Sequence, residues 1–360
     1  MIKIKNKQIG QGKPVFIIAE MACSHDGSMD IAKKIIDAAS KAKADAINLQ
    51  MTNVQDYMVP HFSAGGVSEG KVKEDAESSG ESEIYAYLKK LLWFAEKEWK
   101  ELFEYAREKN LIISVTCNDM ESAKLAKKLD ADIYQIHSSS LLEENLVREV
   151  AKSKKPITLK IGGTLLKEIE QVVEWIKQEG NQEIILLHGY QSYPTKLDDV
   201  NLRFIPTLRE KFSLEVGFAD HTDGDSELAL FVPLLSIPFG ANFIEKHLTH
   251  DRSKKCEDFE SALDPKQFKK FVEFVREAEK TFGQANMRDF SEDELKYRDV
   301  SKKRVVSAKA LKKGAIIKSD DITFKRANTG LLPDQASIFI GKKLKKDVKE
   351  NHSLEKGDVE

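Results

Sequence analysis

The stretch NFIEKHLTHDRSKKCED, residues 242–258, contains a sharp change from apolar to polar residues. It begins with the apolar pair Phe243 and Ile244 and continues with Glu245, Lys246 and His247. A short apolar run that releases several polar residues at once is typical of a buried strand that opens into a site. We therefore expect the carboxyl end of this strand to lie at a functional site.

A second strand-like run repeats the pattern twenty-six residues earlier. Residues 216–219 are apolar or small and lead into Asp220 and His221. His221 and His247, at the ends of neighbouring strands, form a plausible ligand pair for one divalent metal, with Asp258 among the carboxylates nearby in sequence. The alternative is that one histidine is a hydrogen-bonded core residue.

Eight short apolar runs alternate with amphipathic, helix-like segments over about 270 residues. The runs are Val15–Ala19, Ala44–Leu49, Leu111–Val115, Ile133–Ile136, Ile157–Ile161, Ile184–Leu187, Val216–Ala219 and Asn242–Ile244. The segments between and after them are Met29–Lys43, Ser82–Lys109, Ser122–Leu129, Leu142–Ala151, Leu165–Gln178, Leu202–Lys211, Glu227–Leu235 and Pro265–Phe282. This order predicts an α/β fold, a closed (β/α)8 TIM barrel, with a doubly wound open sheet as the alternative.

In such a barrel, the active face lies at the carboxyl ends of the strands. A polar residue follows each run: Glu20, Gln50, Thr116 and Asn118, His137–Ser140, Lys160, His188, Asp220 and His221, and Glu245–His247. Because loops are generally polar, any one of these residues could be polar simply because a loop begins there. That explanation accounts less well for a whole ring of histidines, carboxylates and amides. Ser138–Ser140, Lys160 and Lys246 are candidates for binding a phosphate, although a lysine is often simply solvated.

Bulk composition excludes several classes of protein. The chain has 360 residues, with 57 basic against 59 acidic side chains and a net charge of -2, so no strong field favours nucleic acid or membrane lipid as a partner. The three cysteines have no disulfide or metal-finger spacing. The N-terminus lacks a signal core and no apolar run could span a bilayer. We expect a soluble, cytoplasmic protein.

The pattern of elements changes after residue 285. We predict a barrel domain over residues 1–285, a polar linker over 286–300 and a small β-rich domain over 301–360 that carries two similar phrases, LKKGAIIKSDDI and VKENHSLEKGDV. About 60 residues form a marginal core, so this domain should dock on the barrel or on a second subunit. Met1–Gly12 resembles a hairpin with Gly10 and Gly12 in its turns, and the long loop Met51–Glu81 is expected over the barrel mouth or partly mobile.

Several phrases resemble the sialic acid synthase family. They are IAEMACSHDGSMDIAKKIIDAASKAKADAINLQ, SYPT at residues 192–195, GFADHT at 217–222, IEKHLT at 244–249 and FKRANTG in the tail. The similarity covers nearly the whole chain, and the last 60 residues resemble the antifreeze-like (SAF) domain of those enzymes. The resemblance implies a synthase that condenses phosphoenolpyruvate with an aldose such as N-acetylmannosamine and releases phosphate.

The resemblance also implies a divalent metal and a domain-swapped homodimer. Mn²⁺ is the expected ion, with Mg²⁺ or Co²⁺ as alternatives, and His221 and His247 would be its ligands. The other roles it implies are Glu20 in the pyruvyl site, Ser138 at the phosphate, Gln50, Tyr193 and Asp258 at the sugar, and Arg326 of the partner over the sugar's N-acyl end. The metal would hold the aldehyde oxygen while C3 of the enol attacks its carbon.

This chain departs from the family's pattern on the phosphate side. Two family lysines are replaced by Asn48 and Gln135, a glutamate by Ser140, and the hydroxyl before Asp-His by Ala219. Lys160 replaces part of a Ser-Thr-Gly phrase and can restore one charge from another strand. Three readings follow: a synthase with a relocated phosphate grip, a metal-dependent aldolase or lyase acting on a keto acid, or a non-catalytic sugar-binding relative.

Overall fold

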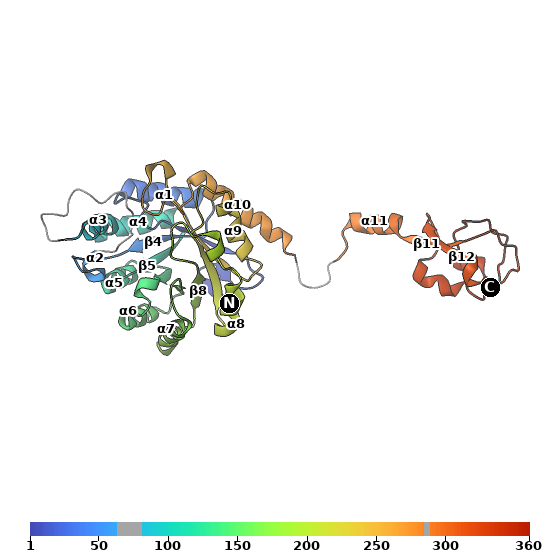
Figure 1. Ribbon diagram of the computed structural model, residues 1–360, viewed down its shortest axis with the longest axis horizontal. Coiled ribbons are helices and arrows are strands. Elements are labelled where there is room, and N and C mark those ends of the chain that lie inside the picture. The colour runs from blue at the N-terminus through green and yellow to red at the C-terminus, as the bar shows by residue number, and fades with distance from the viewer. Residues whose placement is uncertain (63–80, 284–288) are drawn as a thin grey trace. The chain divides into compact units, whose positions relative to one another are not determined.

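Eight parallel strands close into a barrel within residues 1–283 (Figure 1). The computed structural model describes residues 1–62, 81–283 and 289–360. The barrel strands are β3 (Phe16–Glu20), β4 (Ala46–Met51), β5 (Ile112–Cys117), β6 (Ile133–Ile136), β7 (Ile157–Lys160), β8 (Ile184–His188), β9 (Glu215–Asp220) and β10 (Phe243–His247). All eight predicted strands are confirmed, and β10 pairs with β3 to close the barrel. The TIM-barrel prediction is therefore confirmed over the open-sheet alternative.

Helices surround the barrel and follow its strands (Figure 1). They are α1 (Met29–Lys41), α4 (Glu96–Glu108), α5 (Met120–Lys128), α6 (Glu144–Ala151), α7 (Leu166–Gln178), α8 (Phe204–Phe212), α9 (Leu228–Ser236) and α10 (Pro265–Thr281). In α10 the sequence supplies a start signal, because Asp264 accepts hydrogen bonds from the Lys266 and Gln267 amides ahead of an apolar stripe. The stripe packs against the barrel core.

The predicted helix Ser82–Lys109 is wrong as a single element. The structure has α3 (Glu83–Leu92) and α4, separated by Trp93–Ala95. The Glu98 carboxylate accepts the Ala95 amide at 2.7 Å and starts α4 afresh. Phe94 is buried between the two helices, with its ring 4.9 Å from that of His25. A hydrophobic side chain turned inward at the break therefore ends α3.

An apolar layer fills the amino-terminal end of the barrel. It contains Phe16, Ile18, Ala46, Ile112, Ile133, Ile185, Leu187 and Phe243, together with Ile2, Ile4 and Ile9 of a hairpin. This hairpin, β1 (Ile2–Ile4) and β2 (Lys7–Ile9), confirms the expected N-terminal hairpin. Its turn lies at Lys5, which has φ 50°, and not at Gly10 or Gly12, which follow the second strand. The polar residues of the barrel interior are consequently confined to its other end.

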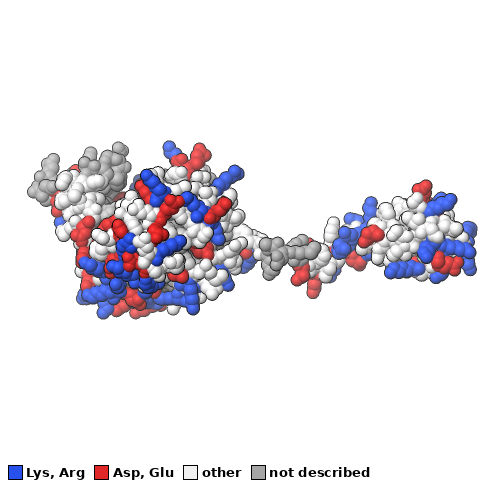
Figure 2. Space-filling view, turned by 90° about the horizontal axis from the view of Figure 1, so that it is seen from below, with Lys and Arg blue, Asp and Glu red and all other residues white. Residues whose placement is uncertain are grey.

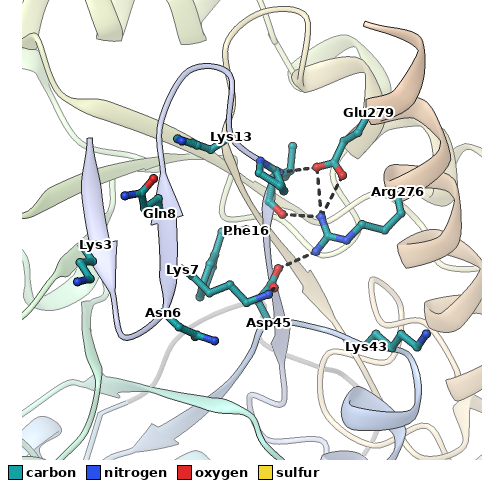
Figure 3. A pocket seen from close by; sticks show the side chains of 12 residues that line it. Lys3, Asn6, Lys7, Gln8, Lys13, Phe16, Lys43, Asp45, Arg276 and Glu279 are labelled. Carbon is teal, nitrogen blue, oxygen red and sulfur yellow. Dashed lines mark hydrogen bonds and ion pairs between the residues drawn. The ribbon is translucent and has the colours of Figure 1, made fainter. Parts of the chain in front are cut away.

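Asp45 joins the hairpin, the barrel and α10 at this end (Figure 3). Its carboxylate accepts the Ile17 amide at 2.8 Å and pairs with Arg276 at 2.7 Å and Lys7 at 2.8 Å. A hollow of about 580 Å³ lies beside these groups. The lysines that line it point in different directions in Figure 3. We therefore interpret this end of the barrel as a structural closure.

Part of the predicted loop Met51–Glu81 is structured. A short helix, α2 (Val54–Tyr57), follows β4, and α3 begins at Glu83. Val54, Tyr85, Leu91 and Leu92 form a buried cluster with Cys23 of the loop after β3. Residues 63–80 of the predicted loop lie outside the described residues, so its expected position over the mouth stays a prediction.

The second unit, residues 284–360, has its own small core. It contains α11 (Glu292–Ser301), β11 (Lys303–Ser307) and β12 (Ile322–Arg326), and its buried residues include Val305, Phe339 and Leu354. Helix α11 occupies most of the expected linker and buries no side chain. The two similar phrases form matching turns, in which Asp321 accepts the Lys318 amide and Asp358 accepts the Glu355 amide. Within the described residues, no helix is long and apolar enough to cross a membrane.

Candidate active site

Three buried charged side chains meet at the carboxyl end of the barrel. Lys160 Nζ, at the end of β7, lies 2.8 Å from Glu245 Oε1 on β10 and 3.3 Å from Glu20 Oε2 on β3. The three residues are exposed by 5%, 1% and 1%, respectively. Each occupies an inward-facing position, because side chains alternate between the two faces of a strand. One cation therefore serves two carboxylates across the width of the barrel.

Amides and hydroxyls extend this cluster around the interior. Asn48 Nδ2 donates to Glu20 Oε2 at 2.8 Å and to Thr116 Oγ1 at 2.7 Å. Gln135 Nε2 donates to Thr116 Oγ1 at 3.1 Å, and Gln135 Oε1 accepts from Thr158 Oγ1 at 2.8 Å. The strands from β3 to β7 thus supply a continuous hydrogen-bonded network that holds the Glu20 carboxylate in place.

The charges in this cluster perturb one another. Burial alone would lower the pKa of Lys160, but Glu245 and Glu20 raise it above its usual value, so the ammonium stays protonated. Burial raises the pKa of Glu245, against the opposing effect of Lys160, and Glu20 adds to the increase. The cluster therefore combines a cationic Lys160 with a Glu245 carboxyl group that is more easily protonated than usual.

His221 and His247 lie beside this cluster, with their ring centroids 5.2 Å apart. His221 Nδ1 lies 2.6 Å from the Tyr190 carbonyl oxygen, so it carries the proton and donates it. Its Nε2 is buried, and so are both ring nitrogens of His247, without a hydrogen-bonding partner among the described residues. Buried nitrogens in this condition are unusual, and their lone pairs are the kind of group that could hold a metal ion.

The electrostatics of the histidine pair suit a metal. Burial and the charge of Lys160 lower the pKa of His221 to about 3, and burial with the neighbouring His221 lowers the pKa of His247. Both rings are therefore neutral and can donate a lone pair. In the described part of the chain, no three His, Cys, Asp or Glu side chains are arranged to hold one metal ion, so the protein would supply two ligands and leave other positions for water and substrate.

Tyr193 and Asp258 border the histidine pair. The Tyr193 ring lies 4.4 Å from the His221 ring and 5.8 Å from the His247 ring, measured between centroids. Asp258 Oδ2 lies 4.0 Å from His247 Nδ1, on a backbone with φ 62°. Burial and the adjacent Glu257 raise the pKa of Asp258 to about 7. An aromatic face and a carboxyl group of this kind are common partners of sugars.

Two glycines bring the loops of this site together. A Cβ on Gly162 would lie 2.4 Å from the Gly189 carbonyl oxygen, and one on Gly189 would lie 2.3 Å from the Ala219 carbonyl oxygen. The loop after β7 therefore approaches the loop after β8, and that loop approaches the end of β9, more closely than any side chain permits. This approach brings Lys160, Tyr193 and His221 to the same place.

The sequence profile of the NeuB family matches residues 35–287, and that of the SAF domain matches residues 303–360. The chain belongs to the NeuB family. A pseudaminic acid synthase of Campylobacter jejuni is 33% identical over 349 residues, which cover 97% of this chain and 97% of that protein. An N,N'-diacetyllegionaminic acid synthase of the same organism is 29% identical over 344 residues, with 95% and 99% covered.

A solved NeuB-family structure agrees with this assignment. The N-acetylneuraminic acid synthetase of Leptospira borgpetersenii, in complex with citrate, has a TM-score of 0.70 and 31% identity, and the match covers 82% of this chain and 95% of that one. The resemblance to the sialic acid synthases and the SAF domain is thereby confirmed. This NeuB-family chain is a condensing enzyme of the sialic acid synthase type.

Most of the residues expected in the site are brought together. Glu20, Lys160, His221, His247, Tyr193 and Asp258 line one end of the NeuB-family barrel, as the contacts above show. Gln50 is two residues beyond Asn48 on β4, so it faces the same side one step nearer the mouth. Ser138 begins the 3₁₀ turn Ser138–Ser140 directly after β6 and His137. These two positions fit the expected substrate contacts, which stay proposals.

One expected residue, Lys246, is not in this group. It alternates with Glu245 and His247 and therefore faces away from the barrel interior, where its Nζ pairs with Asp220 Oδ2 at 2.6 Å and donates to the Thr222 carbonyl at 3.2 Å. Lys246 is 0% exposed and its charge is paired with Asp220, so it is not available to a substrate phosphate. Arg326 ends β12 of the second unit and is exposed there, and its expected role in a partner's site stays a prediction.

Sequence reasoning missed the network of Asn48, Thr116, Gln135 and Thr158 as a functional group. Asn48 and Gln135 were noticed only as departures from a family pattern and Thr116 only as a strand end, and Thr158 was not singled out at all. A period-two count along β4, β5, β6 and β7 would have found them, because each lies on the inward face. Their polarity inside a barrel is the signal, since such positions are otherwise apolar in the layer below.

Proposed function

We propose that this enzyme condenses phosphoenolpyruvate with an N-acetylated or similarly modified aldose, forming a 2-keto-3-deoxy acid of the nonulosonic type and releasing phosphate. The observation that carries the proposal is the position of Lys160, a buried cation, beside the neutral pair His221 and His247 in a NeuB-family barrel. An anionic donor and a carbonyl acceptor need these two kinds of group side by side.

In this proposal, Lys160 binds the donor. Its ammonium exchanges an ion pair with Glu245 for one with the carboxylate or phosphate of phosphoenolpyruvate, and Ser138 donates a hydrogen bond nearby. A charge-assisted hydrogen bond contributes about 1.5 to 3 kcal/mol. Lys160 would therefore compensate for much of the positive charge that is lost where Asn48 and Gln135 replace two family lysines.

The bond changes then follow in order. C3 of the enol forms a bond to the aldehyde carbon, whose oxygen takes up a proton and becomes a hydroxyl. Water adds to C2, and the bond between C2 and the phosphate oxygen breaks to leave a ketone. Glu20, fixed by Asn48 at 2.8 Å, is the group we assign to receive the proton of that water on Oε2.

A divalent ion, Mn²⁺ in our proposal, would polarise the acceptor carbonyl when bound. The protein's part is to hold two neutral imidazoles with free nitrogens at the mouth. Mg²⁺ or Co²⁺ would meet the same donors. The binding of any of these ions is measurable without turnover.

The acceptor would lie against Tyr193, Asp258 and Gln50. The relatives' names give pseudaminic and diacetyllegionaminic acids as products, which supports an acceptor that carries acetamido groups. An aromatic ring beside a carboxyl group with a raised pKa provides stacking and a hydrogen-bond donor or acceptor for such a sugar.

A homodimer completes the proposal, with Arg326 of one subunit serving the site of the other. Residues 303–360 contain 14 Lys and Arg against 8 Asp and Glu, whereas residues 1–283 contain 39 against 46. Lys and Arg side chains gather on the second unit in Figure 2. In addition, Leu228, Phe231 and Leu235 form an exposed apolar stripe on α9, which supports a second copy as its cover.

Subunit mixing tests the dimer. His247→Ala and Arg326→Ala proteins should each be nearly inactive, and a refolded mixture should regain activity because one site in each mixed dimer has both residues. A mixture that stays inactive, while size-exclusion chromatography shows that the subunits have exchanged, would overturn the proposed role of Arg326 in trans.

Turnover tests the function. The protein, incubated with phosphoenolpyruvate, Mn²⁺ and a panel of acetamido aldoses, should form a keto acid whose mass equals donor plus aldose plus water minus phosphoric acid. Turnover of pyruvate with an aldose and no phosphate would favour a lyase instead. No turnover with any aldose would favour a sugar-binding protein.

A further inference from the structure

A chain of hydrogen bonds crosses the mouth from the loop after β4 to the loop after β8. Tyr57 Oη, on α2, donates to Ser139 Oγ at 3.0 Å. Ser139 Oγ lies 2.9 Å from His137 Nδ1. The His137 side chain also hydrogen-bonds the Gln191 side chain, and Gln191 Oε1 accepts from Tyr193 Oη at 2.8 Å.

The direction of these bonds follows from His137. The Ser139 amide points to His137 Nδ1 at 3.3 Å, so this nitrogen is an acceptor and carries no proton. The Ser139 hydroxyl consequently donates to it, and the neutral ring keeps its proton on Nε2 for Gln191. Burial, with Lys160 close by, lowers the pKa of His137 to about 4, which agrees with a neutral ring.

The last link, Tyr193, is in the site itself. Its ring faces both His221 and His247, as described above, and its only other polar anchor in the described residues is Gln191. Gln191 is in turn confined by Gly162, where an added Cβ would lie 2.9 Å from Gln191 Cγ. The chain of bonds therefore fixes the orientation of an aromatic ring that would otherwise rotate, since 36% of Tyr193 is exposed.

We propose that His137 is a positioning residue, which acts through Gln191 to hold the Tyr193 ring against the histidine pair and so sets how the aldose acceptor is seated. This inference rests on the proposed function for its substrate. In this proposal, His137 does not touch the reacting atoms. Ser139 and Tyr57 hold the other side of the imidazole. The loop after β4 is therefore connected to Tyr193 by hydrogen bonds that pass through the His137 ring.

Matched substitutions at His137 test the proposal. His137→Ala breaks the chain, whereas His137→Gln keeps a side-chain N–H that can reach Gln191. A hydrogen bond of ordinary strength corresponds to roughly a fivefold effect. We expect His137→Ala to raise the KM for the aldose about fivefold with the KM for phosphoenolpyruvate unchanged, and His137→Gln to recover most of the loss. Equal losses in both variants, or a rise confined to the KM for phosphoenolpyruvate, would overturn it.

A double-mutant cycle separates this role from a general structural one. If His137 acts through Tyr193, the variant His137→Ala/Tyr193→Phe should lose no more than the worse single variant. Losses that multiply would show that the two residues act independently and would contradict the proposal.

A crystal structure of His137→Ala supplies a readout that does not depend on activity. We expect the Tyr193 ring to leave its 4.4 Å position over His221, and to keep that position in His137→Gln. An unmoved ring in His137→Ala would overturn the inference. If the wild-type protein turns over no aldose, the proposed function fails, but the ring position still decides the role of His137.

Discussion

Lys160 reaches across the barrel to Glu245, with 2.8 Å between Nζ and Oε1, and this ion pair is buried at the carboxyl end of the barrel. The same ammonium lies 3.3 Å from Glu20. The cation is therefore a structural link between β7, β10 and β3, and in the proposed function it also binds the anionic donor. Separate variants can distinguish these two roles.

Lys160→Gln should be destabilised and inactive. Removing one member of a buried ion pair costs about 3 to 5 kcal/mol because it leaves a carboxylate unpaired. The double variant Lys160→Gln/Glu245→Gln removes both charges, so most of the stability should return while the kcat/KM for phosphoenolpyruvate stays at least about 100-fold low. Urea unfolding followed by tryptophan fluorescence measures the first quantity and steady-state kinetics the second. Recovery of activity in the double variant would exclude Lys160 as the donor's cation.

His247→Ala should lose divalent metal. His221 Nε2 and both ring nitrogens of His247 are buried and unpaired among the described residues, and the two rings lie 5.2 Å apart, so removing His247 should weaken Mn²⁺ binding by at least about 100-fold in calorimetric titration. His250→Ala is the matched control, since His250 lies three residues further on and outside the pair. Equal weakening in both variants, or none in His247→Ala, would show that the ion binds elsewhere.

Tyr87 should influence the acceptor through its neighbour Glu257. Tyr87 Oη donates to Glu257 Oε2 at 3.0 Å, and Ser24 Oγ donates to the Glu257 carbonyl at 3.3 Å, directly before Asp258. Tyr87→Phe should therefore raise the KM for the aldose roughly fivefold and leave that for phosphoenolpyruvate unchanged. Tyr105→Phe, which removes a similar bond to Asp37 at 2.9 Å on another helix, is the control. The same change in both variants would argue for general destabilisation.

His25 should make the barrel less stable in acid. It is 1% exposed, and burial lowers its pKa from 6.5 to about 4. Between these two values the unfolded chain binds a proton that the folded chain does not, so stability rises with pH and is lost as pH falls from about 6.5 to about 4. The full loss is about 3 kcal/mol.

The variant His25→Asn isolates this contribution, because Asn can accept the Gly27 amide as His25 Nδ1 does at 3.1 Å but does not titrate. All three tryptophans, Trp93, Trp99 and Trp175, lie in the barrel unit, so their fluorescence reports its unfolding alone. The free energy of unfolding should fall less steeply in the variant over this pH range. Identical slopes would show that His25 is not buried neutral.

The sequence predicted where the strands lie better than it predicted which of their side chains point into the barrel. Apolar runs located all eight strands, because both faces of a parallel barrel strand are covered. The run EKH at residues 245–247 was interpreted as one polar block, but β10 continues through His247, so Lys246 faces outward to Asp220 while its neighbours face inward. Only the register of the strand decides between these directions.

The sequence contains a start signal for helix α11, but the polar composition of this segment favoured a linker in the prediction. Helix α11 begins with Ser291 and Glu294, which cap each other's backbone amides, yet it buries no side chain and shows no apolar period. It was therefore predicted as a linker. Conversely, the break before α4 depends on Phe94 turning toward His25, a contact between loops that no periodicity can reveal.

The fate of the bridging oxygen of phosphoenolpyruvate tests the central claim most directly. We would supply phosphoenolpyruvate with ¹⁸O between C2 and phosphorus, together with an acetamido aldose and Mn²⁺, and measure the released phosphate by mass spectrometry. We expect ¹⁸O in the phosphate and an equal amount of nine-carbon keto acid, because water adds to C2 and the C2–O bond breaks. Phosphate without ¹⁸O, or released without the keto acid, would contradict it.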